Sequence, residues 1–224
     1  MIAIKERPIL FSAPMVRAIL AGHKTVTRRP VRHQPDVSVT DAIPRRNFPH
    51  GPATIDWYWR PKHGHLNGAP SAGWDFKCPY GQPGDRLWVR EAWAADAQVD
   101  AISPRELSQG EPILYPADGT VRQTGCSMLK SGRTRPSIHM PRWVSRILLE
   151  ITDVRVERLQ DISLAQVRKE GCEVREFWLF GSDAEERQKI GARVFGNLWA
   201  SINGEESWRS NPWAWVIEFK RVTP

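Results

Sequence analysis

Two long segments without a sustained hydrophobic period limit where this 224-residue chain can build a core. Residues 31–79 and 94–141 contain many turn-forming and polar residues, and their apolar residues keep to neither a helical nor an alternating pattern. Connections of this length are uncommon in compact domains, so we interpret both segments as insertions, the first with small elements around IDWYW. The remaining residues must supply the framework, and we expect a single domain over 1–224 that carries the two insertions.

Outside the insertions, helical and alternating patterns follow one another along the chain. Alternating apolar residues predict extended segments within 81–93, 145–159 and 212–222. Apolar residues at helical spacing predict helices over 13–22, 161–171 and 182–204. Strands separated by single helices favour an α+β domain built on a small, strongly curved sheet or barrel.

The last two helices carry start signals. Ser163 and Gln166 match a capping box, in which each side chain accepts a hydrogen bond from the other residue's backbone N–H group. Ser182 and Glu185 have the same spacing at the start of the longer helix. The face of this helix that we expect to be buried carries Ile190, Val194, Leu198 and Ile202.

An excess of basic residues indicates a kind of partner. Thirty-two Lys and Arg against 25 Asp and Glu give a formal net charge of +7, which favours nucleic acid or nucleotide ligands. A basic but otherwise ordinary surface would explain the same charge. The composition, with 41% hydrophobic and 25% charged residues, is typical of a folded globular protein. Charge therefore narrows the choice of ligands without assigning a function.

The cysteines and apolar runs favour a cytoplasmic protein. Three cysteines at wide spacing suit a reducing compartment better than a disulfide framework. No apolar run reaches the roughly 18 residues of a membrane-spanning helix, and no secretory signal is visible, so we expect no membrane partner. His63, His65 and Cys78 lack the paired spacing of a zinc site, so we expect neither a metal nor a cofactor. The sequence leaves the oligomeric state open.

The stretch AGHKTVTRRP, residues 21–30, concentrates reactive side chains directly behind a helix-ending glycine. Lys24 and Thr27 meet only if the backbone turns or twists between them, because side chains alternate along a straight strand. A threonine hydroxyl needs a neighbouring base to act as a nucleophile, and Lys24, crowded by Arg28 and Arg29, is a candidate. The structural alternative is a basic, solvated turn.

Glu170 is a further candidate, because it stands against a local preference. A carboxylate in the last turn of a helix meets the negative end of the helix dipole, which costs a few tenths of a kcal/mol to about 1 kcal/mol. A residue placed in this way is a hint of function. The structural alternative is that Glu170 offsets the charges of its neighbours Arg168 and Lys169.

Several sequence blocks together resemble one protein family. ILAGHKTVTRR is similar to the helix and the Gly-x-Lys-x-x-Thr/Glu-x-Arg motif of the ASCH family, a branch of the PUA-like superfamily with a small β-barrel fold. PGDRLWV resembles the family's Gly-Asp turn and next strand, RILLEITDVRVERLQDIS its central strand and following helix, and WVIEFKRV its closing strand. The resemblance implies a small PUA-like (ASCH) β-barrel with flanking helices and two long loop-rich insertions, similar to those of phage and prophage relatives.

The resemblance also implies an activity. Some compact bacterial ASCH proteins are amidohydrolases that remove the acyl group from N(4)-acetylcytidine with a lysine, a threonine and a glutamate. By motif position, these catalytic residues correspond to Lys24, Thr27 and Glu170. The implied reaction is metal-independent hydrolysis of an amide in a small modified nucleoside. The residues expected to bind the substrate are Thr25, Arg28 and Arg29.

Two other functions are compatible with parts of the sequence. A PUA-like module that binds RNA, or reads a modified base without catalysis, would also explain the net charge and the arginine pair. Nuclease activity is conceivable from other branches of the family, but the sequence shows no His pair or carboxylate cluster for phosphodiester cleavage. We therefore expect an amidohydrolase, with RNA binding as the alternative.

Overall fold

The computed structural model describes residues 4–35, 39–44, 56–61, 75–123 and 125–222. The chain forms two compact units. The first unit comprises Met1–Lys24, Gly84–Ile151 and Phe219–Pro224, and the second comprises Thr25–Pro83 and Thr152–Glu218. The fold is α+β, with both parallel and antiparallel strand pairing, which confirms that part of the prediction. The prediction of a single domain with two insertions stays a prediction.

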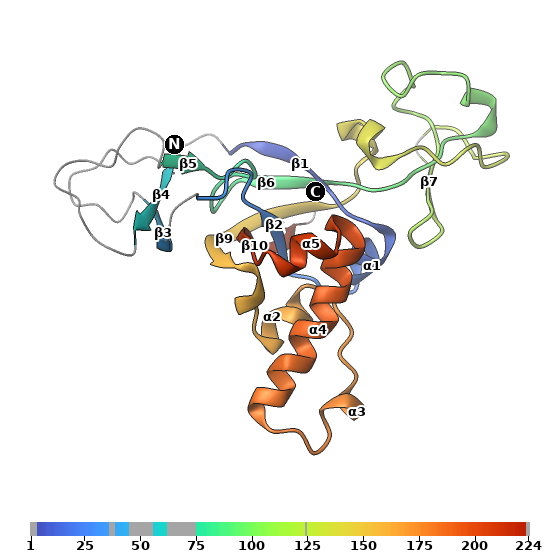
Figure 1. Cartoon of the computed structure of the whole chain (residues 1–224). Coiled ribbons are helices and arrows are strands. Elements are labelled where there is room, and N and C mark those ends of the chain that lie inside the picture. The colour runs from blue at the N-terminus through green and yellow to red at the C-terminus, as the bar shows by residue number, and fades with distance from the viewer. Residues whose placement is uncertain (1–3, 36–38, 45–55, 62–74, 124, 223–224) are drawn as a thin grey trace. The chain divides into compact units, whose positions relative to one another are not determined.

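The sheet of the first unit combines three segments that lie far apart in the sequence. Strand β1 (Glu6–Leu10) pairs in parallel with β6 (Arg86–Arg90), and β6 pairs antiparallel with the start of β9 (Leu148–Arg158), as Figure 1 shows. The register places Leu87 opposite Leu149, and both side chains are fully buried. The strands expected within 81–93 and 145–159 are therefore confirmed.

Helix α1 (Ala13–Leu20) ends where the sequence predicts. Val16 and Ile19 are its buried residues, and Gly22 follows with a positive φ of 76°. A residue with a Cβ atom is strained in this left-handed conformation. Glycine therefore lets the chain leave the helix and continue directly into Lys24.

Buried polar side chains organise the segment 94–141, which lacks a hydrophobic period. Its regular elements, with the turn that follows, are β7 (Ile113–Tyr115), β8 (Thr120–Arg122), and the 3₁₀ turns η2 (Ala97–Val99), η3 (Ser137–His139) and η4 (Arg142–Val144). Asp96 accepts three hydrogen bonds from backbone N–H groups, and Arg135 donates two to backbone carbonyls. Irregular backbone needs such partners when it is buried.

Arg146 anchors the same segment through an ion-pair network. Its guanidinium donates to both carboxylate oxygens of Glu91, at 2.9 and 3.0 Å, and to Asp118 at 2.8 Å. The guanidinium also lies over the ring of Tyr115, whose hydroxyl donates to the carbonyl of Val144 at 2.7 Å. Burial raises the pKa of Tyr115 to about 12, and the hydrogen bond from Arg146 lowers the pKa of Asp118 to about 2. Both groups therefore keep one protonation state across the neutral pH range.

The second unit is built around β10 (Trp213–Val222). Strand β2 (Val26–Pro30) pairs with it antiparallel, and the later part of β9 lies on its other side. The register places Thr27 opposite Ile217. The first five residues of β10 are all buried, so this part of the strand is covered on both faces. The strand expected over 212–222 is confirmed.

The first insertion contributes a small antiparallel sheet to the second unit. Its strands are β3 (Val39–Pro44), β4 (Asp56–Pro61) and β5 (Asp75–Lys77). Trp59 stacks on Phe76 with ring centres 4.3 Å apart, and Trp57 packs edge-on against Trp215 of β10 at 5.5 Å. Such aromatic pairs add to the gain from buried apolar area. The elements expected around IDWYW are therefore present and pack on strand β10.

The helices of the second unit follow β9. They are α2 (Leu164–Lys169), α3 (Glu176–Leu179), α4 (Ala184–Asn203) and α5 (Glu205–Arg209), with a 3₁₀ turn η5 at Leu159–Asp161. The capping box of Ser163 and Gln166 is confirmed, because both of its hydrogen bonds form. The start predicted for the longer helix was wrong by one residue. Asp183 rather than Ser182 caps α4 and accepts a hydrogen bond from the N–H of Glu186, because a carboxylate also benefits from the positive end of the helix dipole.

The predicted core face of α4 was also wrong. The buried residues are Gly191, Phe195, Gly196 and Trp199, whereas Ile190, Val194 and Leu198 are only partly buried and Ile202 is half exposed. The two glycines allow close approach of neighbouring helices. A Cβ atom at 191 would lie 2.9 Å from Leu164 of α2, and one at 196 would lie 2.8 Å from Trp208 of α5. Close packing at these glycines determines which face of α4 is buried. A prediction from hydrophobic periodicity misses this face, because glycine does not count as an apolar residue.

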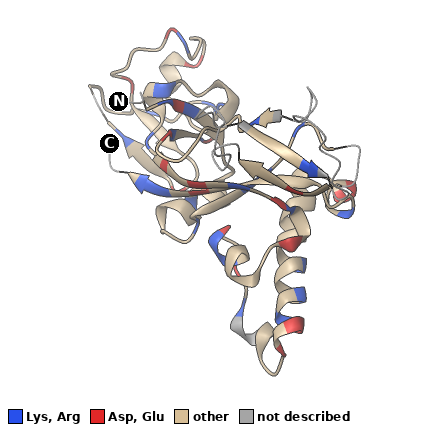
Figure 2. Ribbon diagram, turned by 90° about the vertical axis from the view of Figure 1, so that its left-hand side faces the viewer, with Lys and Arg blue, Asp and Glu red and all other residues tan. Residues whose placement is uncertain are grey.

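Among the described residues, the strands form open sheets and no closed barrel occurs. Figure 2 shows basic and acidic residues interspersed on the helices. No helix in this part of the chain is both long and apolar enough to span a bilayer. The strand pairing of the described residues therefore supports the α+β class but not the expected barrel.

We expect Gly196→Ala to destabilise the second unit. A methyl group there would lie 2.8 to 3.2 Å from three atoms of the Trp208 indole, which is rigid. Overpacking costs about 1 to 3 kcal/mol, more than the roughly 1 kcal/mol that alanine gains over glycine inside a helix. Urea unfolding followed by tryptophan fluorescence should show a lower midpoint.

Gly191→Ala is the control for this substitution, because the nearest atom there is the flexible end of the Leu164 side chain. We expect a smaller loss of stability in this variant. An equal or larger loss in Gly191→Ala would contradict the explanation by a clash with Trp208.

Candidate active site

Strand β2 lies beside the end of helix α2. The backbone N–H of Thr25, just before β2, donates a hydrogen bond of 2.8 Å to the carbonyl of Lys169, the last residue of α2. Glu170 follows as the C-terminal cap of the helix. The motif strand and the helix end that carries Glu170 are therefore joined by a direct backbone contact within the second unit.

Arg28 is a deeply buried charge of this region. Its side chain has no exposed surface, and its guanidinium donates to Glu157 at 2.9 Å and to Glu170 at 3.4 Å. The guanidinium carbon also lies 5.9 Å from the ring centre of Phe195 on α4. Removing a charge from water is costly unless it is paired, and two carboxylates meet that need. The alternative that Arg28 belongs to a solvated basic turn is therefore wrong.

Glu170 is buried although its neighbours are not. Its side chain is 3% exposed, whereas Arg168 and Lys169 are exposed. The ion pair with Arg28 connects residues that are 142 positions apart. A charge offset on the helix surface, as the structural alternative proposed, does not account for this burial.

Arg29 and Tyr80 add a second pair of polar groups. Burial lowers the pKa of Arg29, and the charges of Tyr80 and Glu170 oppose that change. Burial also raises the pKa of Tyr80, and the charge of Arg29 opposes it. Glu170 therefore acts electrostatically on Arg29 as well as on Arg28.

Thr27 is buried in the middle of β2, with 2% of its surface exposed. Alternation along the strand places it on the same face as Arg29 and opposite to Arg28. Its pairing partner is Ile217 of β10. Its hydroxyl therefore sits in the interior of the second unit.

Lys24 is the last residue of the first of the three segments that make up the first unit. It is 2% exposed, which is rare for a lysine. Its backbone N–H donates to the carbonyl of Ala18 at 3.0 Å, and its ammonium lies 5.6 Å from the ring centre of Phe11. The predicted site residues thus divide: Arg28, Arg29 and Glu170 interact within the second unit, and Lys24 belongs to the first.

Two members of the buried cluster escaped the sequence-based prediction. Glu157 lies in β9, where the other charged residues Glu150, Asp153 and Arg155 leave it without a distinguishing signal. Tyr80 lies at the end of the first insertion and has no local signal. Its role depends on Arg29, which is 51 positions away, so only the folded chain reveals it.

No group of three or more His, Cys, Asp or Glu side chains suited to a metal ion occurs among the residues that the structure describes. His63 and His65 lie outside those residues. Cys78, Cys126 and Cys172 are not joined in disulfide bonds. The prediction of a metal-independent site stays a prediction.

Comparison of the chain with protein-family models, with curated proteins and with solved structures gave no match in any of the three. The geometry of the buried cluster and the motif resemblance therefore carry the functional conclusion by themselves.

We expect Arg28→Met to destabilise the protein by about 3 to 5 kcal/mol, because it leaves the buried Glu170 without this cation, whereas Glu157 is partly exposed and keeps its pair with Arg155. Urea unfolding followed by tryptophan fluorescence measures the loss. Arg209→Met is the control, because Arg209 pairs with Glu205 and Glu206 on an exposed surface and should cost less than about 1 kcal/mol. Equal losses in the two variants would show that the Arg28 pair is not a buried, structurally required interaction.

Proposed function

We propose that the protein is a cytoplasmic, metal-independent amidohydrolase of N(4)-acylated cytosine nucleosides such as N(4)-acetylcytidine. In this proposal the chain is an ASCH-like, PUA-like domain enlarged by two insertions. Lys24, Thr27 and Glu170 are its catalytic residues. The support comes from the motif resemblance and from the environment of these three side chains.

The burial of Glu170 against the motif strand is the observation that carries the proposal. A carboxylate at the end of a short helix is normally exposed, yet Glu170 is 3% exposed and pairs with Arg28, next to Thr27 in β2. Lys24 and Thr27 are each 2% exposed. Polar and charged groups are seldom buried unless they are paired or functional. The three residues that the resemblance selects are thus also three of the few buried polar residues.

The proposed reaction splits the amide in two steps. The Thr27 hydroxyl oxygen attacks the acyl carbonyl carbon while Lys24 accepts the hydroxyl proton. The C–N bond then breaks, the cytosine amine leaves with a proton delivered through Glu170 or Lys24, and an ester forms on Thr27. Water hydrolyses this ester, which gives a carboxylate and restores the threonine hydroxyl. A water nucleophile held by Thr27 would give the same products without the ester.

The arginines have different roles in this scheme. The Arg28 guanidinium is fully buried and donates to two carboxylates, so we assign it to positioning Glu170. Arg29 is only partly buried, which suits it better to contacting the substrate or the developing oxyanion. Thr25 uses its backbone N–H to hold the helix end, and its partly exposed side chain is available to the nucleoside.

Incubating the purified protein with N(4)-acetylcytidine tests the proposal, because the ultraviolet spectrum changes when the amide becomes an amine. We expect turnover that falls at least about 100-fold in Thr27→Val, Lys24→Met and Glu170→Gln, the usual contribution of a general acid or base. Thr27→Ser keeps the hydroxyl and should retain part of the activity. Lys169→Met, an exposed neighbour of Glu170, should leave the rate unchanged.

Each variant is compared with the wild type by circular dichroism and urea unfolding, so that loss of fold is separated from loss of chemistry. The absence of turnover with N(4)-acetylcytidine and related N-acyl nucleosides, or full activity in Thr27→Val, would overturn the proposal. Salt-sensitive RNA binding that persists in Thr27→Val, without hydrolysis, would instead favour the RNA-binding alternative.

A further inference from the structure

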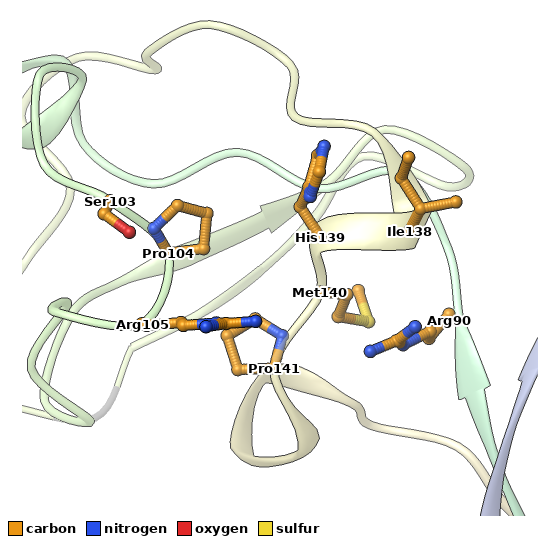
Figure 3. A pocket seen from close by; sticks show the side chains of 8 residues that line it. All are labelled: Arg90, Ser103, Pro104, Arg105, Ile138, His139, Met140 and Pro141. Carbon is orange, nitrogen blue, oxygen red and sulfur yellow. The ribbon is translucent and has the colours of Figure 1, made fainter.

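A basic pocket lies wholly within the first unit, in the second insertion and beside strand β6. It has a volume of about 350 Å³. Its lining residues are Arg90, Ser103, Pro104, Arg105, Ile138, His139, Met140 and Pro141. Figure 3 shows that Arg90 and Arg105 extend from opposite sides toward Met140. The lining contains two guanidinium groups and an imidazole, and no carboxylate.

The cations of this pocket lack acidic partners. Within the part of the chain that the structure describes, the side chains of Arg90, Arg105 and His139 make no ion pair with a carboxylate. The buried Nε of Arg90 has no hydrogen-bond partner there. Arg142, which lies close by over the same Trp88 ring, is by contrast paired with Glu6 at 2.8 Å. The pocket therefore keeps its positive charge for a ligand.

Trp88 holds the Arg90 guanidinium in place. The guanidinium carbon lies 4.7 Å from the centre of the indole, and Trp88 is 8% exposed in β6. A stacked arginine is fixed in orientation while its N–H groups stay available. Arg105, by contrast, is exposed and lies in a loop. A stacked donor and an exposed donor thus lie on opposite sides of the same cavity.

The pocket also has an apolar part. Met140 is fully buried, and the rings of Pro104 and Pro141 and the side chain of Ile138 complete the wall. A volume of about 350 Å³ is at the small end of ligand pockets, which run from about 300 to 1,000 Å³. This volume suits a small molecule that combines ring systems with one anionic group better than an extended ligand.

From these features we propose that the first unit binds a phosphate ester that carries a ring, with a nucleotide as the ligand class. Arginine donates in parallel to two oxygens of a phosphate, and Arg90 and Arg105 are placed to share one phosphate group. The organic part packs on Met140 and the two prolines. This site is separate in its residues from Lys24, Thr27 and Glu170, and it does not depend on the proposed hydrolase activity.

A second hollow, in the second unit, does not offer the same chemistry. It has a volume of about 450 Å³ and is lined partly by Lys189, Arg209 and Trp208. Lys189 pairs with Glu185, and Arg209 pairs with Glu205 and Glu206. Arg193 also lines this hollow, but two of its three cations are paired and the carboxylate of Glu205 belongs to the lining, so the pocket of the first unit is the better anion site.

Isothermal titration calorimetry of the full chain tests the proposal with four probes: cytidine 5′-monophosphate, cytidine, inorganic phosphate and an eight-nucleotide oligocytidylate. We expect the monophosphate to bind with one-to-one stoichiometry and more tightly than cytidine or phosphate alone. Arg105→Gln should weaken this binding at least about tenfold, and Arg90→Lys should weaken it similarly, because a lost charged hydrogen bond is worth about that factor. Lys169→Met, which changes an exposed residue of the second unit, should bind the monophosphate as the wild type does.

Arg133→Gln is the matched control, because it removes an exposed arginine of the same insertion that does not line the pocket. It should change the affinity by less than about twofold, within the spread expected of surface substitutions. Tighter, Arg105-dependent binding of the oligonucleotide would identify a polynucleotide as the source of the phosphate, and a preference for the monophosphate would identify a free nucleotide. No binding by any phosphate-containing probe, or equal effects of Arg105→Gln and Arg133→Gln, would overturn the proposal.

Discussion

The buried pairing of Arg28 with Glu157 and Glu170 is the interaction on which the second unit depends. It connects three elements: the motif strand β2, the central strand β9 and the end of helix α2. The desolvation of a guanidinium is tolerated only when carboxylates surround it, so these elements must reach their places together. The same requirement fixes Glu170, which would otherwise be unfavourable at the end of a helix. A residue that looks misplaced locally is therefore held by a long-range ion pair.

The two insertions are attached to the framework by different kinds of contact. In the first insertion, Trp57 and Trp59 pack against Trp215 and Trp213 of β10. Contacts between buried aromatic rings therefore attach this insertion to the framework. In the second, single polar residues satisfy the irregular backbone or form ion pairs with the framework, as Asp118 does with Arg146. Neither arrangement needs a repeating hydrophobic pattern. This explains how long segments without such a pattern still contain ordered structure.

The sequence predicted those parts of the fold whose signals are local. The alternation in 145–159 and 212–222, the capping box at Ser163 and the glycine after α1 all depend on residues within one element, and the structure confirms them.

Features that depend on distant residues were not predictable in the same way. Arg28 has carboxylate partners 129 and 142 positions later, so its burial leaves no trace in the TRR sequence around it. The buried face of α4 is determined by contacts of two glycines with other helices. A prediction from the spacing of apolar residues along α4 therefore chose the wrong face. In the candidate site, the motif predicted which residues to look for, while Glu157 and Tyr80 became visible only in the folded chain.

The most direct test of the proposed active site is a crystal structure of Thr27→Val with uncleaved N(4)-acetylcytidine. We predict that the acyl carbonyl carbon lies beside residue 27, with the Lys24 amine and the Glu170 carboxylate within hydrogen-bonding distance of the reacting groups. A nucleoside bound elsewhere, with Glu170 in contact only with arginine side chains, would contradict the proposed active site.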